Sequence, residues 1–283
     1  MRIMSKKAVV FIAGQSNAHA HGQLLPENER IINPLPNVFS LDRDPNQAFD
    51  RECVVWSGFT TAGKNLGESQ DHTASLAYHL AKLWQNAIDQ GMDLPDLYIV
   101  QISIGSQAIV NGMWNPDRER ILIPGPLGTA KIALFHLARQ IYRLVMADLQ
   151  DAEVLGFHWL GSEQEIWHDT WKSPELDKRY DYFFDSLLNA IGKPCPMYFY
   201  ETYLKPCCER YGLPTEAGDR VNQAICRQAE RLGGHLVQAS NSPFWNPESD
   251  LYGVFAPDKG HYLAHVQAWF AREFFNETLR RIG

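Results

Sequence analysis

Short apolar runs separated by amphipathic stretches recur along this chain, and this rhythm restricts the fold more than any other feature. Residues 8–13 form an unbroken apolar run that stops at Gly14, as expected of a strand buried on both faces of a parallel sheet. Residues 97–105 repeat the pattern, and shorter strands are predicted at 153–159, 196–200 and 235–239. Apolar residues at helical spacing predict helices over 73–90, 129–148, 174–191, 215–232 and 260–281.

Strands that alternate with helices of this length predict an α/β fold with a mostly parallel sheet covered on both faces. We expect a three-layer α/β/α sandwich with a flavodoxin-like sheet of about five strands. Residues 19–70 are rich in Pro, Asn, Asp and Gly and predict an extended loop with short pieces of structure. No linker, repeat or low-complexity segment divides the chain, so residues 1–283 are expected to form a single domain.

Composition and charge disfavour several classes of partner. The 26 basic and 33 acidic side chains give a net charge of −7, and no basic run stands out, so neither nucleic acid nor an anionic membrane is expected to bind. The apolar run before Gly14 is shorter than a signal-peptide core or a membrane span. Five irregularly spaced cysteines resemble neither a disulfide framework nor a zinc site, and reduced thiols predict a cytoplasmic protein.

Three turns that contain chemistry-bearing residues follow separate predicted strands. Ser16 comes directly after the first strand, residues 105–106 follow the second, and residues 161–163 follow the third. Because the carboxyl ends of parallel strands line one crevice, we expect these turns to converge on one edge of the sheet. His261, at the start of the last predicted helix, must reach the same crevice if it acts there.

Ser16, His261 and Asp258 are the residue types of an acyl-transfer triad. A serine hydroxyl is a weak nucleophile until a neighbouring base removes its proton. His261 is the candidate base, because histidine is the usual general base at physiological pH. Asp258, three residues earlier, would orient the imidazole. The arrangement differs from an α/β-hydrolase, whose Gly-x-Ser-x-Gly turn would need glycine where Ala18 stands.

The motif Gly-Gln-Ser-Asn over residues 14–17 resembles the first block of the SGNH (GDSL-type) hydrolases, in the form found in carbohydrate acetylesterases related to sialate O-acetylesterase. The Asp-x-x-His motif over 258–261 is similar to the block that ends that superfamily. Residues 65–68 resemble its second block, whose glycine amide helps to bind the oxyanion, and residues 104–109 with the downstream Trp114 resemble a further segment. The correspondence runs over about residues 8–275.

The resemblance implies a serine esterase that removes acetyl or other short acyl groups, on a carbohydrate, without a cofactor. It implies an oxyanion hole formed by the backbone amides of Ser16 and Gly67. Candidate substrate-binding residues are Gln15, Asn17, Gly105, Gln107, Trp114 and Glu163; Glu163 could instead anchor the loops around the site, and Gly67 and Gly105 could be plain turn glycines.

The sequence departs from this pattern at Gly161, where the acetylesterases carry a glutamine that supplies a side-chain donor. Asn17, Gln107 or Gln164 could replace that donor, and a chain without one could be a weak or inactive carbohydrate-binding protein. An acyltransferase would use the same triad. The pairs His19/His21 and His168/Asp169 lack a third ligand, so no metal is expected.

Overall fold

A computed structural model describes residues 6–41, 58–63, 66, 73–122, 130–202, 208–209, 212–257 and 260–282. Its main sheet contains seven strands in the order β3-β2-β4-β1-β7-β8-β9. These strands are β1 (Lys7–Gly14), β2 (Leu35–Leu41), β3 (Phe59–Ala62), β4 (Asp96–Ser103), β7 (Glu153–Leu160), β8 (Met197–Tyr200) and β9 (His235–Val237). A separate antiparallel hairpin joins β5 (Arg120–Leu122) to β6 (Ala130–Ile132).

The five strands predicted from apolar runs are neighbours in the sheet and all pair in parallel. They lie in the order β4-β1-β7-β8-β9, which is the flavodoxin-like order 2-1-3-4-5 when these strands are counted along the chain. β1 is central and pairs in parallel with both β4 and β7. Its residues 8–13 are completely buried, which explains why the run is continuously apolar. The α/β/α prediction is confirmed.

The predicted count of about five strands is too low, because two strands lie beyond β4. β2 pairs in parallel with β4, and β3 pairs antiparallel with β2 at the edge of the sheet. β2 alternates between buried and partly exposed residues and therefore lacks the apolar run of a central strand. The helix predicted at 129–148 begins later, at Leu134, because residues 130–132 belong to the hairpin.

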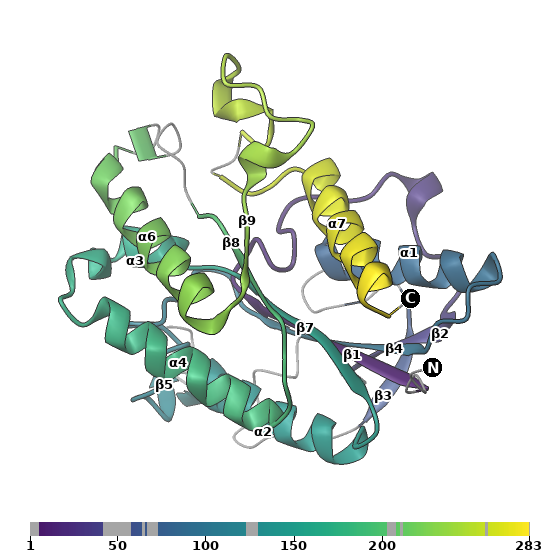
Figure 1. Ribbon diagram of the computed structural model, residues 1–283. Coiled ribbons are helices and arrows are strands. Elements are labelled where there is room, and N and C mark those ends of the chain that lie inside the picture. Colours follow the sequence, from purple (N-terminus) through teal and green to yellow (C-terminus); the bar gives the residue numbers. More distant parts are fainter. Residues whose placement is uncertain are drawn as a thin grey trace.

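Helices cover both faces of the sheet (Figure 1). On one face, α1 packs against α7; on the other, α4 packs against both α2 and α6. The helices are α1 (Leu76–Asp89), α2 (Leu134–Asp148), α3 (Glu163–Trp167), α4 (Leu176–Ile191), α6 (Thr215–Leu232) and α7 (Ala264–Ile282), with 3-10 turns at Glu27–Glu29, Thr170–Lys172, Ala239–Asn241 and Asp250–Gly253. Among the residues that the structure describes, no helix has both the length and the apolar character needed to cross a bilayer.

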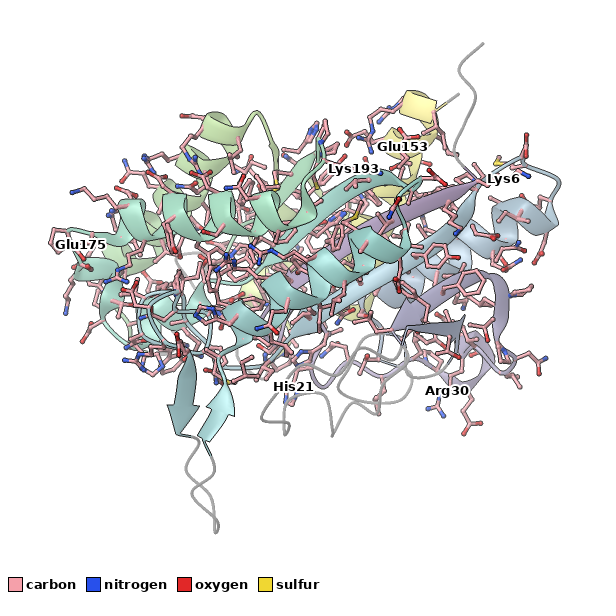
Figure 2. The ribbon with its side chains drawn as sticks, turned by 90° about the horizontal axis from the view of Figure 1, so that it is seen from below. Lys6, His21, Arg30, Glu153, Glu175 and Lys193 are labelled. Carbon is pink, nitrogen blue, oxygen red and sulfur yellow. The ribbon has the colours of Figure 1, made fainter. Side chains whose placement is uncertain are left out.

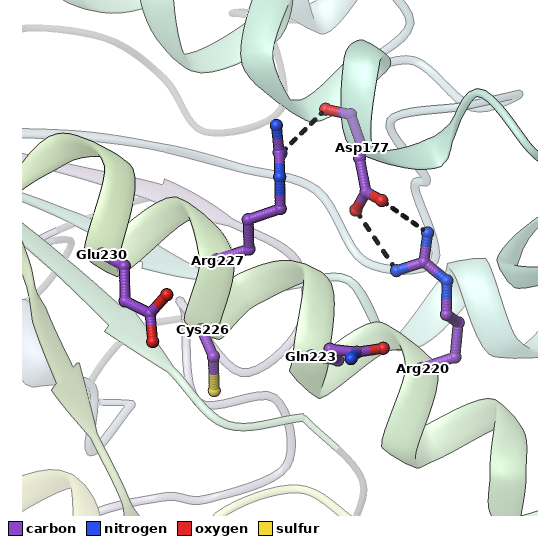
Figure 3. Close-up of a pocket in the computed structure, with 6 residues that line it drawn as sticks. All are labelled: Asp177, Arg220, Gln223, Cys226, Arg227 and Glu230. Carbon is purple, nitrogen blue, oxygen red and sulfur yellow. Dashed lines mark hydrogen bonds and ion pairs between the residues drawn. The ribbon is translucent and has the colours of Figure 1, made fainter.

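Ion pairs join α4 to α6, and Figure 3 shows the one between Asp177 and Arg220. The pairs are Asp177 with Arg220 at 2.9 Å, Asp181 with Arg227 at 2.7 Å and Asp185 with Arg231 at 2.8 Å. Hydrogen bonds from the Arg227 guanidinium lower the pKa of Asp181 to about 2. Partly exposed pairs contribute little stability each, and the three pairs follow the same order along both helices, as parallel helices require. The neighbouring depression of about 500 Å³ is lined by arginines that already have carboxylate partners.

Gly14 ends β1 directly beside Leu160, the last residue of β7. Its φ of 149° lies at the edge of the region that favours glycine, and a Cβ atom here would overlap the Leu160 carbonyl oxygen. That same oxygen accepts a hydrogen bond from the Gln15 N–H at 2.9 Å. The Gly14 carbonyl accepts one from the indole Nε1 of Trp114 at 3.0 Å. Only glycine fits at position 14, because any side chain would collide with the Leu160 carbonyl oxygen where the chain turns towards Ser16.

Replacing Gly14 with alanine should destabilise the protein by about 3 kcal/mol or more, because the methyl group meets backbone rather than a movable side chain. The matched control is Gly63→Ala, where ordinary φ and open space predict a change below about 1 kcal/mol. Urea unfolding midpoints of the two variants measure the difference. Equal midpoints would contradict the role assigned to Gly14.

Candidate active site

Ser16 and His261, which are 245 residues apart in the sequence, meet at the carboxyl edge of the sheet. Ser16 lies in the turn after β1, and His261 lies shortly before α7. The Ser16 Oγ atom is 2.8 Å from the His261 Nε2 atom, and both residues are half-buried. The site lies where the strand order reverses between β1 and β7, which is where open α/β sheets bind ligands.

This geometry allows proton transfer between the two side chains. With Nε2 unprotonated, the imidazole accepts the hydroxyl hydrogen and raises the nucleophilicity of Oγ. The backbone N–H of Ser16 has no acceptor within the described part of the chain. It is therefore free to donate to an oxyanion that forms at a carbon bonded to Oγ.

The Asn17 side chain holds the segment that carries His261. Its Oδ1 atom accepts a hydrogen bond from the Tyr262 N–H at 2.8 Å, and its Nδ2 donates to the Gly260 carbonyl at 3.3 Å. These two backbone groups flank His261 on either side. The Nδ2 atom also donates to Glu163 Oε1 at 2.8 Å, so one amide joins the turns after β1 and β7 to the histidine segment. Asn17 is 3 % exposed, and its side chain is fully used.

Gln267 on α7 continues this network. Its Nε2 atom donates to the Asn17 carbonyl at 2.8 Å, and its Oε1 accepts from the Leu76 N–H at 3.2 Å, at the first residue of α1. Gln267 is completely buried. The helix pair α1–α7 is thereby tied to the turn that contains Ser16.

Two buried carboxyl groups support the loops of the site from α3. Burial raises the pKa of Glu163, whose Oε2 atom has no hydrogen-bond partner among the described residues. Burial also raises the pKa of Glu165, which accepts from the N–H groups of Ile109 and Val110 at 2.5 and 3.1 Å. The alternative that Glu163 anchors loops rather than binds substrate agrees with these contacts.

The loop after β4 lies beside the nucleophile. A Cβ atom on Gly105 would be 3.7 Å from the Ser16 Cβ, which is ordinary contact, so Gly105 is a neighbour of the serine. Gln107 stiffens this loop: its Oε1 accepts from the Met113 N–H at 3.1 Å, and its Nε2 donates to the Gly105 carbonyl at 3.3 Å. The Gln107 amide is thus occupied within the loop.

Three predicted substrate-binding residues lie beneath the surface instead. Trp114 is completely buried, packs edge-on against the ring of Trp159 and binds the Gly14 carbonyl, so its ring has no open face for a sugar. Asn17 is enclosed by the contacts described above. Gln15 is 1 % exposed, and its Nε2 atom has no hydrogen-bond partner in the described part of the chain. Trp114 and Asn17 are enclosed and their polar groups are bound within the fold, so direct substrate contact stays a prediction that these contacts do not favour.

Asp258 and Gly67 lie outside the described residues, so the predicted third member of the triad and the predicted second oxyanion donor have no structural description here. At Gly161, a Cβ atom would approach the Trp159 ring at 3.0 Å and the Gln15 Cγ at 3.4 Å. Of the three proposed replacement donors, Asn17 and Gln107 are occupied. The Gln164 side chain makes no hydrogen bond to another described residue.

The site also contains residues that the motif analysis treated only as weak metal-ligand candidates. The His19 ring is buried, with Nδ1 3.2 Å from Ser103 Oγ, and its pKa is lowered to about 3 by burial and by the nearby His21 and His261. The exposed His21 ring lies 5.4 Å from the His261 ring between centroids. The only indication in the sequence that His19 and His21 belong to the site was that they follow Ser16 by three and five residues. Within the described ranges, no group of three or more His, Cys, Asp and Glu side chains could hold a metal ion.

No protein-family model matches this sequence, and the search of curated proteins found no match. Solved structures do resemble it over the full length. A crystal structure of NanS superposes with a TM-score of 0.60 at 15 % identity, covering 99 % of this chain and 98 % of that one. A protein from Arabidopsis thaliana gives a TM-score of 0.56 at 13 % identity, covering 98 % of each chain. At these identities the likeness establishes a shared fold.

Replacing Asn17 with alanine should slow the reaction of Ser16 with a fluorophosphonate by about 100-fold, because His261 loses the contacts on both of its flanks. Asn17→Asp keeps the acceptor for Tyr262 but loses the donor, and should fall between alanine and the native protein. The control is Asn86→Ala on the exposed face of α1. Labelling at native rates in a folded Asn17→Ala protein would show that the Asn17 hydrogen bonds on both sides of His261, here called the Asn17 clamp, do not position the histidine.

The raised pKa of Glu163 predicts a stability that depends on pH. The folded state holds its proton to a higher pH than the unfolded state, so stability falls as pH rises from the ordinary carboxyl pKa through the raised one. In Glu163→Gln, the amide oxygen can still accept the hydrogen bond from Asn17 Nδ2, and the loss of stability with rising pH disappears because glutamine does not ionise. The stability of this variant relative to the native protein should therefore increase between pH 4 and pH 8 in urea unfolding, whereas exposed Glu29→Gln should show no such trend.

Proposed function

We propose that this protein is a serine-dependent carboxylic ester hydrolase that removes acetyl or other short acyl groups from a hydroxyl of a carbohydrate. The observation that carries the proposal is the 2.8 Å approach of Ser16 Oγ to His261 Nε2 at the reversal point of the sheet. The free Ser16 N–H beside that pair can donate to the negatively charged oxygen that forms during acyl transfer. The fold shared with the NanS structure and the Gly-Gln-Ser-Asn motif support the same assignment.

In the first half of the reaction, Ser16 Oγ attacks the carbonyl carbon of the ester while His261 Nε2 takes the hydroxyl proton. Negative charge then develops on the carbonyl oxygen, where the Ser16 N–H stabilises it; each such donor contributes about 3–4 kcal/mol. The C–O bond to the alcohol breaks, and the protonated His261 returns its proton to the leaving oxygen. The product is an acyl-Ser16 ester and a free alcohol.

In the second half, water takes the place of the alcohol. His261 removes a proton from the water as its oxygen attacks the acyl carbon, and then donates that proton to Ser16 Oγ as the acyl–serine bond breaks. A carboxylic acid leaves and the serine is restored. Asp258 is proposed to orient His261, and the Gly67 amide is proposed to join the Ser16 amide in binding the oxyanion.

The carbohydrate part of the proposal rests on the resemblance of the first and last motifs to those of carbohydrate acetylesterases. The half-buried Ser16 is reachable from solvent, and the exposed His21 lies beside it, so an ester on a bulky polar alcohol has access to the nucleophile. The site as proposed needs only these side chains and water.

His261→Ala should lower turnover of p-nitrophenyl acetate about 1000-fold or more, because both proton transfers pass through this imidazole. Ser16→Ala should abolish turnover and also abolish covalent labelling by a fluorophosphonate, measured by intact mass. The controls are Ser106→Ala, an exposed serine in the neighbouring loop, and His265→Ala, an exposed histidine four residues after His261. Labelling that survives in Ser16→Ala would rule out Ser16 as the nucleophile.

The same assay separates the alternatives. A carbohydrate-binding protein without catalysis would bind an acetylated sugar but would neither hydrolyse the esters nor react with the fluorophosphonate. An acyltransferase would react with the reagent and would transfer the acetyl group to an added alcohol faster than to water. Asp258→Asn should reduce turnover while the protein remains folded, since only the orientation of His261 is affected.

A further inference from the structure

His21 flanks the pair Ser16–His261 on its solvent side. It lies five residues after Ser16 in the same turn, and its backbone N–H donates to the Ser16 carbonyl at 3.0 Å. Its ring is 5.4 Å from the His261 ring between centroids, with 57° between the two planes. His21 is exposed, and Figure 2 shows it far from Lys6 and Glu153, near which β1 and β7 begin.

The neighbouring rings of His19 and His261 lie beside His21 without bonding to its nitrogens. His19, two residues earlier, is 5 % exposed, lies 6.0 Å from the His21 ring and stays uncharged because burial lowers its pKa to about 3. The ring nitrogens of His21 have no hydrogen-bond partner within the described part of the chain. The two ring nitrogens of His21 can therefore form hydrogen bonds with a ligand at the site.

The proposed reaction fixes where the alcohol part of an ester must lie. His261 Nε2 protonates the leaving oxygen, so this oxygen must come within hydrogen-bond distance of Nε2, which is itself 2.8 Å from Ser16 Oγ. The Asn17 clamp and the buried Glu163 occupy the interior side of His261. The rest of the alcohol must extend towards solvent, where His21 stands next to the same imidazole.

We propose that His21 binds the alcohol part of the substrate, through a hydrogen bond between its imidazole and a hydroxyl adjacent to the ester oxygen. His21 then selects esters of polyhydroxylated alcohols over esters of simple alcohols. This role rests on the proposed esterase function and goes beyond it, because it assigns recognition of the leaving group to one side chain. A hydroxyl both donates and accepts, so it can pair with an imidazole nitrogen that carries a hydrogen or with one that carries a lone pair.

The test compares two acetate esters that differ by a single hydroxyl: ethyl acetate and ethylene glycol monoacetate. The native protein should favour the hydroxylated ester in kcat/KM. His21→Leu keeps the bulk of the side chain without polar atoms and should reduce this preference roughly five- to tenfold, the loss expected for one hydrogen bond, because hydrolysis of ethylene glycol monoacetate falls more than hydrolysis of ethyl acetate. His21→Gln should retain part of the preference.

The control is His235→Leu, a half-exposed histidine at the amino end of the edge strand β9. It should leave the ratio of the two rates as in the native protein. An equal loss on both esters in His21→Leu would mean that the ring only supports His261, and an unchanged ratio would mean that it does not contact the alcohol; either result overturns the proposal. If the native protein hydrolyses neither ester nor p-nitrophenyl acetate, the proposed function itself fails.

Discussion

The hydrogen bonds of the Asn17 side chain are the interaction on which the site depends. Ser16 is placed by the end of β1, whereas His261 arrives from the far end of the chain on an irregular segment. One amide binds the backbone on both sides of His261 and also binds Glu163, the first residue of α3, shortly after β7. Because both ends of this amide are saturated and buried, the distance between Oγ and Nε2 is set by the folded core rather than by a surface loop.

The two buried carboxyl groups of α3 lower the stability of the fold but fix the position of the loops around Ser16. Glu163 and Glu165 are taken out of water at a free-energy cost, which the raised pKa of each reports. In return, their oxygens hold Asn17 and the loop after β4, both of which border Ser16. Polar groups of this kind are retained where the position of a loop matters more than the net stability of the fold.

Close backbone packing at the ends of β1 and β7 provides the remaining constraint. Because Gly14 has no side chain, the backbones of the two strands meet directly at this point. The carbonyl of Gly14 accepts a hydrogen bond from the Trp114 indole. The positive φ angles of Ser106 and Ser162, 61° and 95°, occur in the turns that follow β4 and β7. Sparsely populated backbone conformations thus occur in both turns, as is common at functional sites, although Asp169, Leu251 and Tyr252 also have positive φ angles.

The sequence by itself determined the α/β class, the five parallel strands and the pairing of Ser16 with His261 as candidates, because apolar periodicity and residue chemistry are local properties. It missed β2 and β3, since an edge strand that is half exposed has no continuous apolar run. It assigned Trp114 and Asn17 to the substrate, because sequence reports the residue type and not the direction in which a side chain points. Only the tertiary structure decided that Trp114 is core, that Asn17 clamps His261 and that His21 stands beside it, since each depends on contacts between segments up to 245 residues apart.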